Sequence, residues 1–187
     1  MDLIEAILTR RSSTRLLEPG PDRDDLLKLL EVAATAPDHG ALRPWRLVLV
    51  EGEARHRLGL ALAAAAAGAD SASADRARTK PLRAPLLISV IFCPRQHPKV
   101  PEWEQLATAV TLVQYLHLLL HDRGWGAIWR TGDGVDAAQV QACLDLQDDE
   151  RLLGWLYVGT PDPQARFAPR PEFDVRTRLS VLDGSES

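Results

Sequence analysis

The stretch RRSSTR, residues 10–15, sets three arginines and three hydroxyl groups within six residues. Guanidinium groups match pairs of phosphate oxygens, and a hydroxyl beside them can donate or accept a hydrogen bond. The stretch could therefore bind an anion such as a phosphate. It could also be the solvated end of a first helix, where a cation interacts favourably with the helix dipole. That alternative accounts for one or two arginines but leaves Ser12 and Ser13 unexplained.

A second stretch, GWGAIWRTGDG at residues 124–134, holds four glycines around two tryptophans. It is either a turn from a helix into a strand, or a place where glycine lets the backbone approach a flat ligand. A dinucleotide-binding fingerprint is not supported, because Trp129 stands where that motif needs its third glycine. The chain also lacks the Gly-Lys-Ser/Thr phosphate loop of NTPases.

A metal site is not expected from the histidines. His117 and His121 are four residues apart and would share one face of a helix. The glutamate of an HExxH motif is absent and no third ligand stands at a suitable spacing. No spacing in the chain supports a Ser-His-Asp or Cys-His catalytic arrangement either.

The composition of the 187 residues, 45% hydrophobic with a net charge of −4, is that of a globular protein. The acidic balance argues against binding to nucleic acid. The start, MDLIEAILTR, has no basic region before its apolar residues, and no apolar stretch is long enough to span a bilayer. Cys93 and Cys143 form no CxxC motif, which is typical of a reducing compartment. We therefore expect a cytoplasmic protein without membrane contact.

The elements that must position these residues follow from the hydrophobic pattern. Alternating helices and strands predict an α/β or α+β sheet covered by helices, in one domain spanning residues 1–187. The segment GADSASADRARTK (68–80) is predicted to be a mobile polar loop. The tail from residue 161 is either disordered or lies along a partner subunit. Helices are predicted at 2–10, 26–35, 53–67, 103–123 and 136–144, and strands at 45–51, 86–92, 127–130 and 152–159.

Three segments in order resemble the nitroreductase family of flavin enzymes, and most closely its short YdjA-like branch. They are RRSSTR, APDHGALRPWRLVLVE (36–51), and RGWGAIWRTG (123–132) followed by LLGWLYVGTP (152–161). The resemblance extends from residue 2 to about residue 161. It implies an α+β fold, or α/β sandwich, with a mostly antiparallel or mixed central sheet covered by helices. It also implies a homodimer with FMN at the subunit interface.

The resemblance implies roles for particular residues but no catalytic side chain, since N5 of the flavin carries the hydride. The FMN phosphate and ribityl chain would be held by Arg10, Arg11 and Ser12. The flavin ring would lie near Thr131, Gly132 and Asp133. Thr35 and His39 would reach the flavin from the other subunit. The nicotinamide cofactor would bind along His121, Asp122, Arg123, Gly124, Trp125 and Gly126.

Two positions depart from the family pattern. Ala41 stands where many members have asparagine, and Arg43 stands where glutamine usually precedes Pro-Trp. Arg43 could place a positive charge near the pyrimidine edge of the flavin, which would favour the reduced anionic ring and raise its potential. Arginines of the tail are candidates for a further phosphate contact: Arg166, Arg170, Arg176 and Arg178.

The function that the resemblance implies is hydride transfer from NADH or NADPH to FMN, and then to a flat, electron-poor acceptor by a ping-pong mechanism. A nitroaromatic compound, a quinone or an enone would be such an acceptor. Other flavin chemistry on the same scaffold remains an alternative, as does an FMN-binding sensor or carrier that does not turn over. The identity of the acceptor and the choice between NADH and NADPH stay open.

Overall fold

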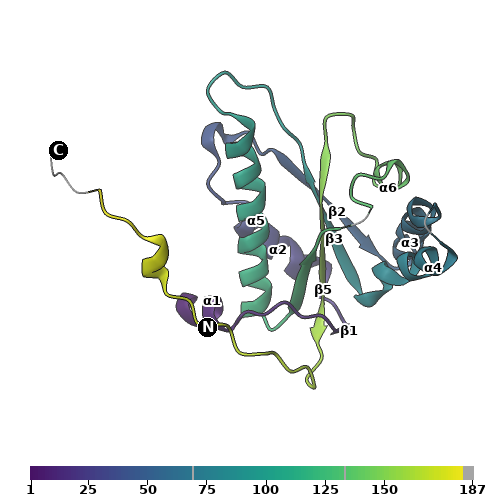
Figure 1. Ribbon diagram of the computed structural model, residues 1–187, viewed down its shortest axis with the longest axis horizontal. Coiled ribbons are helices and arrows are strands. Elements are labelled where there is room, and N and C mark those ends of the chain that lie inside the picture. The colour runs from purple at the N-terminus through teal and green to yellow at the C-terminus, as the bar shows by residue number, and fades with distance from the viewer. Residues whose placement is uncertain (69, 133, 183–187) are drawn as a thin grey trace.

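The sheet is organised around its last strand in the chain, β5 (Arg151–Pro161), as the computed structural model in Figure 1 shows. One edge of β5 pairs with β3 (Leu86–Phe92), and β2 (Trp45–Glu51) pairs beyond it. The other edge pairs first with β4 (Gly126–Arg130) and then with β1 (Leu16–Leu17). Every one of these pairings is antiparallel, which confirms the predicted type of sheet.

The structure describes residues 1–68, 70–132 and 134–182. Within these residues no helix has both the length and the apolar character needed to cross a membrane. The predicted strands agree with the structure to within about two residues at each end. The two-residue strand β1 was not predicted, because so short a segment carries no periodic pattern.

The centre of the sheet is buried on both faces by helices. Strand β3 reads LLISVIF and is buried throughout, as its unbroken apolar pattern predicts. Its residues alternate between the two layers, so Ile88 faces one hydrophobic cluster and Leu87 faces the other. The first layer contains α2 (Arg23–Ala33) and α5 (Glu102–Asp122), and α1 (Leu3–Thr9) contacts α5. The second layer, on the other face of the sheet, contains α3 (Glu53–Ala66), α4 (Ser71–Thr79) and α6 (Ala138–Cys143) (Figure 1).

The loop predicted at residues 68–80 was wrong, because most of this segment forms helix α4. Asp70 caps its start by accepting a hydrogen bond from the backbone N–H of Ser73, at 2.7 Å. Gly59 of α3 lets the two helices approach, since a Cβ there would overlap the carbonyl oxygen of Arg78. Packing against α3 therefore stabilises a polar segment whose serines and aspartates read locally as a loop.

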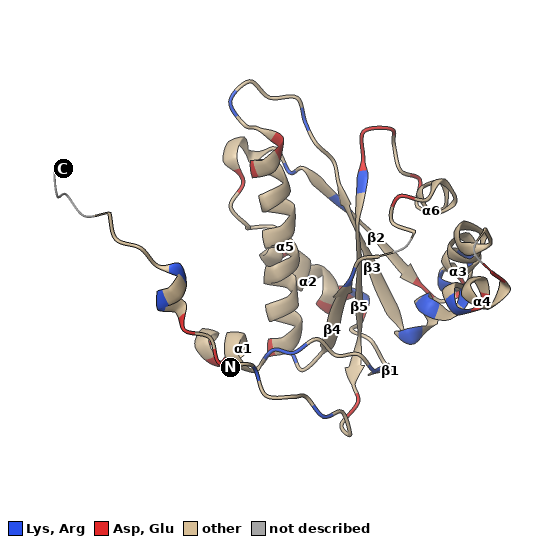
Figure 2. Cartoon of the chain, in the orientation of Figure 1, with Lys and Arg blue, Asp and Glu red and all other residues tan. Residues whose placement is uncertain are grey.

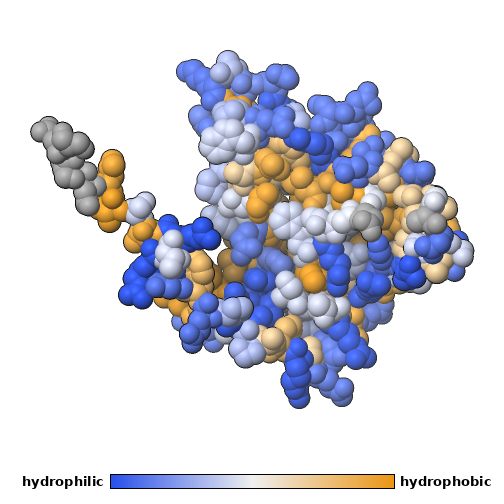
Figure 3. Space-filling view, viewed as in Figure 1, coloured by the Kyte–Doolittle hydropathy of each residue, from blue (hydrophilic) through white to orange (hydrophobic). Residues whose placement is uncertain are grey.

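The C-terminal tail leaves the sheet after β5 and extends beyond the body of the protein (Figure 1). Between residues 162 and 182 its one helical element is a short 3-10 turn, η3 (Val175–Arg178). Five of its large apolar side chains are exposed: Phe173, Val175, Leu179, Val181 and Leu182. Figure 3 shows hydrophobic surface on the part of the tail that extends from the body.

Candidate functional site

The RRSSTR segment lies against the start of β4. Ser12 forms a parallel bridge with Ala127, and the backbone N–H of Ser13 donates to the Ala127 carbonyl at 3.0 Å. Gly126 makes this approach possible, because a Cβ there would lie 3.0 Å from the Ser13 hydroxyl oxygen and 2.7 Å from the Leu16 side chain. Two stretches more than a hundred residues apart in the sequence therefore meet at one end of β4.

Three arginines gather where α1 ends. The guanidinium of Arg11 donates to the Leu8 carbonyl at 2.9 Å, and that of Arg170 donates to the Arg10 carbonyl at 2.7 Å. Burial lowers the pKa of Arg10, and the positive charges of Arg170 and Arg11 lower it further. Among the described residues no carboxylate forms an ion pair with any of the three. Nη1 of Arg10 is buried there without a hydrogen-bond partner.

Two histidines of α5 complete this group, which we call the Arg10 cluster: Arg10, Arg11, His117, His121 and Arg170. His117 is buried, and its Nε2 has no hydrogen-bond partner in the described part of the chain. Burial lowers the pKa of His117, and so do the charges of Arg10 and His121, against an opposing effect of the Ala127 backbone. Burial and Arg10 also lower the pKa of His121, whereas Asp122 raises it.

A pocket of about 330 Å³ opens beside the Arg10 cluster. The predicted nicotinamide segment and the RRSSTR segment both line it, so the structure brings these two sequence predictions to one place. Met1 at the N-terminus and Phe167 in the tail also line it. Its lining is Met1, Thr9, Arg11, Ser13, His117, His121, Gly124, Trp125, Gly126, Ala127, Pro161 and Phe167.

The residues predicted near the flavin ring follow the far end of β4. Thr131 follows β4 and lies roughly 13 Å from Ala127, at about 3.3 Å of rise per residue. Thr131 and Gly132 are exposed and line a smaller pocket of about 200 Å³. Asp133, predicted with them, lies outside the described residues. Among the described residues no strand pairs with the outer edge of residues 128–130, so this edge is open between the two ends.

The remaining predicted flavin residues lie on the connection from α2 to β2, and they line neither of these two pockets. Thr35 is exposed, and its hydroxyl donates to the Val32 carbonyl at 2.8 Å. Nδ1 of His39 lies 2.8 Å from a carboxylate oxygen of Glu104. Arg43 is exposed and has a φ of +46°. The contact of Thr35 and His39 with the flavin of a second subunit stays a prediction, and so does the place of Arg43 near the flavin.

Asp38 shapes this connection, and its role was not predicted. Its carboxylate accepts hydrogen bonds from the backbone N–H groups of Leu42 at 3.1 Å and Arg43 at 2.7 Å. The loop turns through left-handed conformations at Gly40, Ala41 and Arg43. The local sequence around Asp38, Ala-Pro-Asp at residues 36–38, is too common a pattern to indicate such a role.

Comparison with known proteins identifies the scaffold. Residues 7–160 match the nitroreductase family. The chain belongs to the nitroreductase family. YdjA of Escherichia coli K12, a candidate NAD(P)H nitroreductase, is 37% identical over 167 residues, covering 88% of this chain and 91% of YdjA. The crystal structure of a nitroreductase-like family protein from Bacillus cereus is similar with a TM-score of 0.85 and 24% identity, covering 98% of this chain and 97% of its own.

A third relative is NfnB of sphigopyxis sp. strain HMH, described as an FMN and NADPH-dependent nitroreductase. Its crystal structure has a TM-score of 0.77 and 23% identity, and the match covers 98% of this chain and all of NfnB. The fold neighbours confirm the predicted nitroreductase-like α+β fold.

Several residues of this nitroreductase-family site were missed or left unranked. Among the four tail arginines the structure distinguishes Arg170, which reaches the Arg10 carbonyl, whereas Arg176 pairs with Asp174. Ser13 is buried against Gly126. His117 had one usable signal, its spacing of four residues from His121. Within the described chain no group of three or more His, Cys, Asp or Glu side chains could hold a metal ion.

Proposed function

We propose that this protein is an FMN-dependent NAD(P)H oxidoreductase that reduces a flat, electron-poor acceptor, such as a nitroaromatic compound, a quinone or an enone, by a ping-pong mechanism. Its place in the nitroreductase family supports this proposal. The likeness to YdjA and to NfnB, with its stated FMN and NADPH dependence, supports it further.

The observation that carries the proposal is the unpartnered Nη1 of Arg10. A buried cationic donor without an acceptor is costly, and here two further guanidinium groups lie beside it. An anion with several acceptor oxygens would satisfy these donors at once. The phosphate of FMN is such an anion, so the residues present fit the cofactor that the family implies.

We infer that the chain holds FMN along β4. Arg10, Arg11 and Ser12 would bind the phosphate and ribityl chain, with Arg170 adding a further cation. Thr131 and Gly132, together with Asp133, would contact the ring. When bound, FMN supplies a ring that can accept a hydride from NAD(P)H and deliver it to a second substrate.

The nicotinamide cofactor would bind along residues 121–126, four of which border the 330 Å³ pocket. His121, Trp125 and two glycines line this pocket together with Arg11. Gly124 leaves the backbone open to close approach, because no atom lies within 4 Å of the position that its Cβ would take. The role of these residues is to orient the donor, since hydride transfer needs no general acid or base from the protein.

A homodimer would complete the site with Thr35 and His39 of a second copy of the chain, and Arg43 would lie near the pyrimidine edge of the flavin. Apolar side chains that a single chain leaves exposed support this part of the proposal. Four of them lie on the short helix α1: Leu3, Ile4, Ile7 and Leu8. Three lie on α5, namely Trp103, Val110 and Tyr115, and the others are the five tail residues named above.

The test begins with purified protein loaded with FMN. We expect a bound flavin spectrum, and rapid bleaching of that spectrum by NADH or NADPH under argon. The Arg10→Gln variant should bind FMN at least about tenfold more weakly, because it removes charge-assisted hydrogen bonds to the phosphate. Arg178→Gln is the matched control, since it removes an exposed tail arginine.

The outcomes separate the proposal from its alternatives. Protein that binds no FMN would overturn the proposal. Protein that binds FMN but is bleached by neither nicotinamide would be a flavin-binding sensor or carrier. An Arg10→Gln variant with unchanged FMN affinity would place the phosphate elsewhere and return RRSSTR to the end of a helix.

A further inference from the structure

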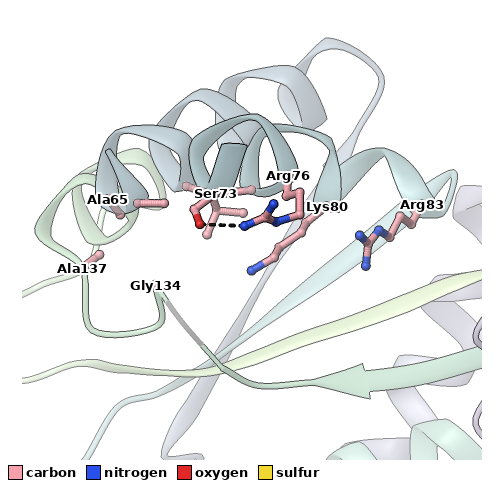
Figure 4. Close-up of a pocket in the computed structure, with 10 residues that line it drawn as sticks. Ala65, Ser73, Arg76, Lys80, Arg83, Gly134 and Ala137 are labelled. Atoms are coloured by element: carbon pink, nitrogen blue, oxygen red, sulfur yellow. Dashed lines mark hydrogen bonds between the residues drawn. The ribbon is translucent and has the colours of Figure 1, made fainter. Parts of the chain in front are cut away.

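A second group of cations lies on the opposite layer of the sheet, over the face covered by α3, α4 and α6. A pocket of about 310 Å³ there is lined by Arg76, Lys80 and Arg83 (Figure 4). The 200 Å³ pocket at the end of β4 shares Lys80 and Arg83 with it and adds Arg130. We call the two adjoining pockets, with these four basic residues, the cationic cleft.

The local sequence explains why these side chains gather. Arg76, Lys80 and Arg83 are spaced by four and three residues, so they project from one side of α4 and of the 3-10 turn η2 (Lys80–Arg83). Figure 4 shows Lys80 and Arg83 extending from these elements toward the strands. Figure 2 shows the same concentration of basic residues at this end of the molecule. The contact between Gly59 and the Arg78 carbonyl fixes the position of α4.

Most of this charge has no counter-ion in the described part of the chain. Arg76 donates to the Ser73 hydroxyl at 2.8 Å, and that hydroxyl donates to Asp70 at 2.8 Å. No described carboxylate forms an ion pair with Lys80, Arg83 or Arg130. The lining residues that the structure describes include none that is acidic.

The floor of the cleft adds neutral donors. The guanidinium of Arg130 lies 5.7 Å from the centre of the Tyr157 ring. Burial raises the pKa of Tyr157, although Arg130 and Arg83 oppose that rise, so its hydroxyl stays protonated at neutral pH. Trp155 is 4% exposed, and its Nε1 has no acceptor within the described residues. Cations and N–H or O–H donors together form a surface that favours an anion.

We propose that the cationic cleft binds the carboxylate or phosphate group of a substrate whose reacting ring lies at Thr131–Gly132. This inference rests on the proposed function, because those two residues line the cleft and are also the ones expected at the flavin ring. The anionic group has two possible sources: the acceptor itself, as a carboxylate, or the phosphates of the nicotinamide dinucleotide. The Arg10 cluster is a separate site, since none of its residues lines the cleft.

The first experiment measures binding without turnover. Calorimetry with the FMN-loaded protein compares 4-nitrobenzoate with 4-nitrobenzamide, which has a similar shape and no charge. We expect the carboxylate to bind at least about tenfold more tightly. The double substitution Lys80→Gln and Arg83→Gln should remove that preference. Arg78→Gln is the matched control, because Arg78 is an exposed residue of the last turn of α4, directly before η2, and lines neither pocket. Arg83→Gln alone serves if the double variant does not fold.

The second experiment identifies the source of the anion. Steady-state KM values are measured for both acceptors and for NADH and NADPH, in the wild type and the double variant. In the double variant, a higher KM confined to 4-nitrobenzoate assigns the cleft to the acceptor, and a higher KM confined to NADH and NADPH assigns it to the dinucleotide phosphates. A double variant that binds 4-nitrobenzoate, NADH and NADPH as tightly as the wild type does would overturn the proposal.

The calorimetric result does not depend on catalysis. A charge preference in a protein that nicotinamides fail to bleach would leave the anion site standing while the oxidoreductase proposal fails. Bleaching of the flavin by a nicotinamide, in a protein with no charge preference, would support the oxidoreductase proposal and contradict an anion site for the acceptor.

Discussion

Ala41 adopts a backbone conformation that is unfavourable for alanine. Its φ is +51°, in the left-handed region where a Cβ is unfavourable and where glycine or asparagine is preferred. The asparagine that the resemblance implies at this position would fit this left-handed backbone better than alanine does. Arg43, with a φ of +46°, is under the same constraint two residues later.

We predict that Ala41→Gly stabilises the protein by about 1 kcal/mol, since it removes the strain of a left-handed alanine. The gain is partly offset by the greater freedom of glycine in the unfolded chain. Denaturant unfolding would measure the difference. Ala34→Gly is the control, because Ala34 has a φ of −67° and the same change there should destabilise the protein.

The histidines of the Arg10 cluster predict a pH dependence. Burial holds the pKa of His117 below its ordinary value of 6.5, so below that pH the unfolded chain binds more protons than the folded one. The stability of the FMN-free protein is therefore expected to fall as the pH drops from 7 to 5. His121 acts in the same direction. His117→Gln should show a smaller fall in melting temperature, and His56→Gln, which changes an exposed histidine, should match the wild type.

The result with FMN bound tests the assignment of the phosphate. A bound phosphate would favour the protonated histidine, so the loaded protein should lose less stability between pH 7 and pH 5 than the free protein. An identical pH dependence in the two forms would mean that the bound anion lies away from His117.

At the scale of elements, one polar network ties strand β2 to the connection that precedes β5. The guanidinium of Arg46 donates to both carboxylate oxygens of Glu150, at 2.7 and 2.6 Å. It also donates to the Asp145 carbonyl at 2.7 Å. The hydrogen bonds from Arg46 lower the pKa of Glu150 to about 2, and those from the Gln147 backbone and Cys93 add to the effect. Burial beside this carboxylate raises the pKa of Cys93 to about 12.

We predict that Arg46→Gln destabilises the protein by about 2 kcal/mol, because it leaves the Glu150 carboxylate, 9% exposed, without its counter-ion. The stabilisation by this pair is complete above the ordinary pKa of Glu150, 4.5, and is lost as the pH falls toward about 2. The difference in stability between the wild type and the variant should therefore shrink as the pH falls through this range. Arg23→Gln breaks an exposed pair with Glu51 and should change stability by less than about 1 kcal/mol.

The elements also show what sequence could and could not predict. The long helix and the apolar strands were predicted because their patterns extend over many residues. Helix α4 was not, because its stability comes from contact with Gly59 of another helix. The cationic cleft was missed for the same reason, since α4 and the turn η2 that follows it position three of its basic residues, Arg76, Lys80 and Arg83. Arg170 could not be ranked, because its contact with Arg10 joins positions 160 residues apart and leaves no local pattern.

At the scale of the whole molecule, the exposed tail predicts dependence on a partner. We expect a chain that ends at residue 172, and so keeps Arg170, to dimerise at least about tenfold more weakly than the full chain. The deleted segment carries Phe173, Leu179 and Leu182, and burying each such side chain stabilises an interface by about 1.5–3 kcal/mol. Sedimentation over a range of concentrations would measure the change. Unchanged self-association would show that the tail does not lie on the partner.

The central position of β5 has a consequence for synthesis of the chain. The ribosome makes β1, β2, β3 and β4 first, yet β1, β3 and β4 all pair with β5. Until residue 161 has been made, β4 and one edge of β3 have no neighbour and expose unpaired backbone groups, which invite aggregation. Polypeptides cut short before β5 are therefore expected to be substrates for chaperones and proteases, and a premature stop codon upstream of it should abolish soluble protein.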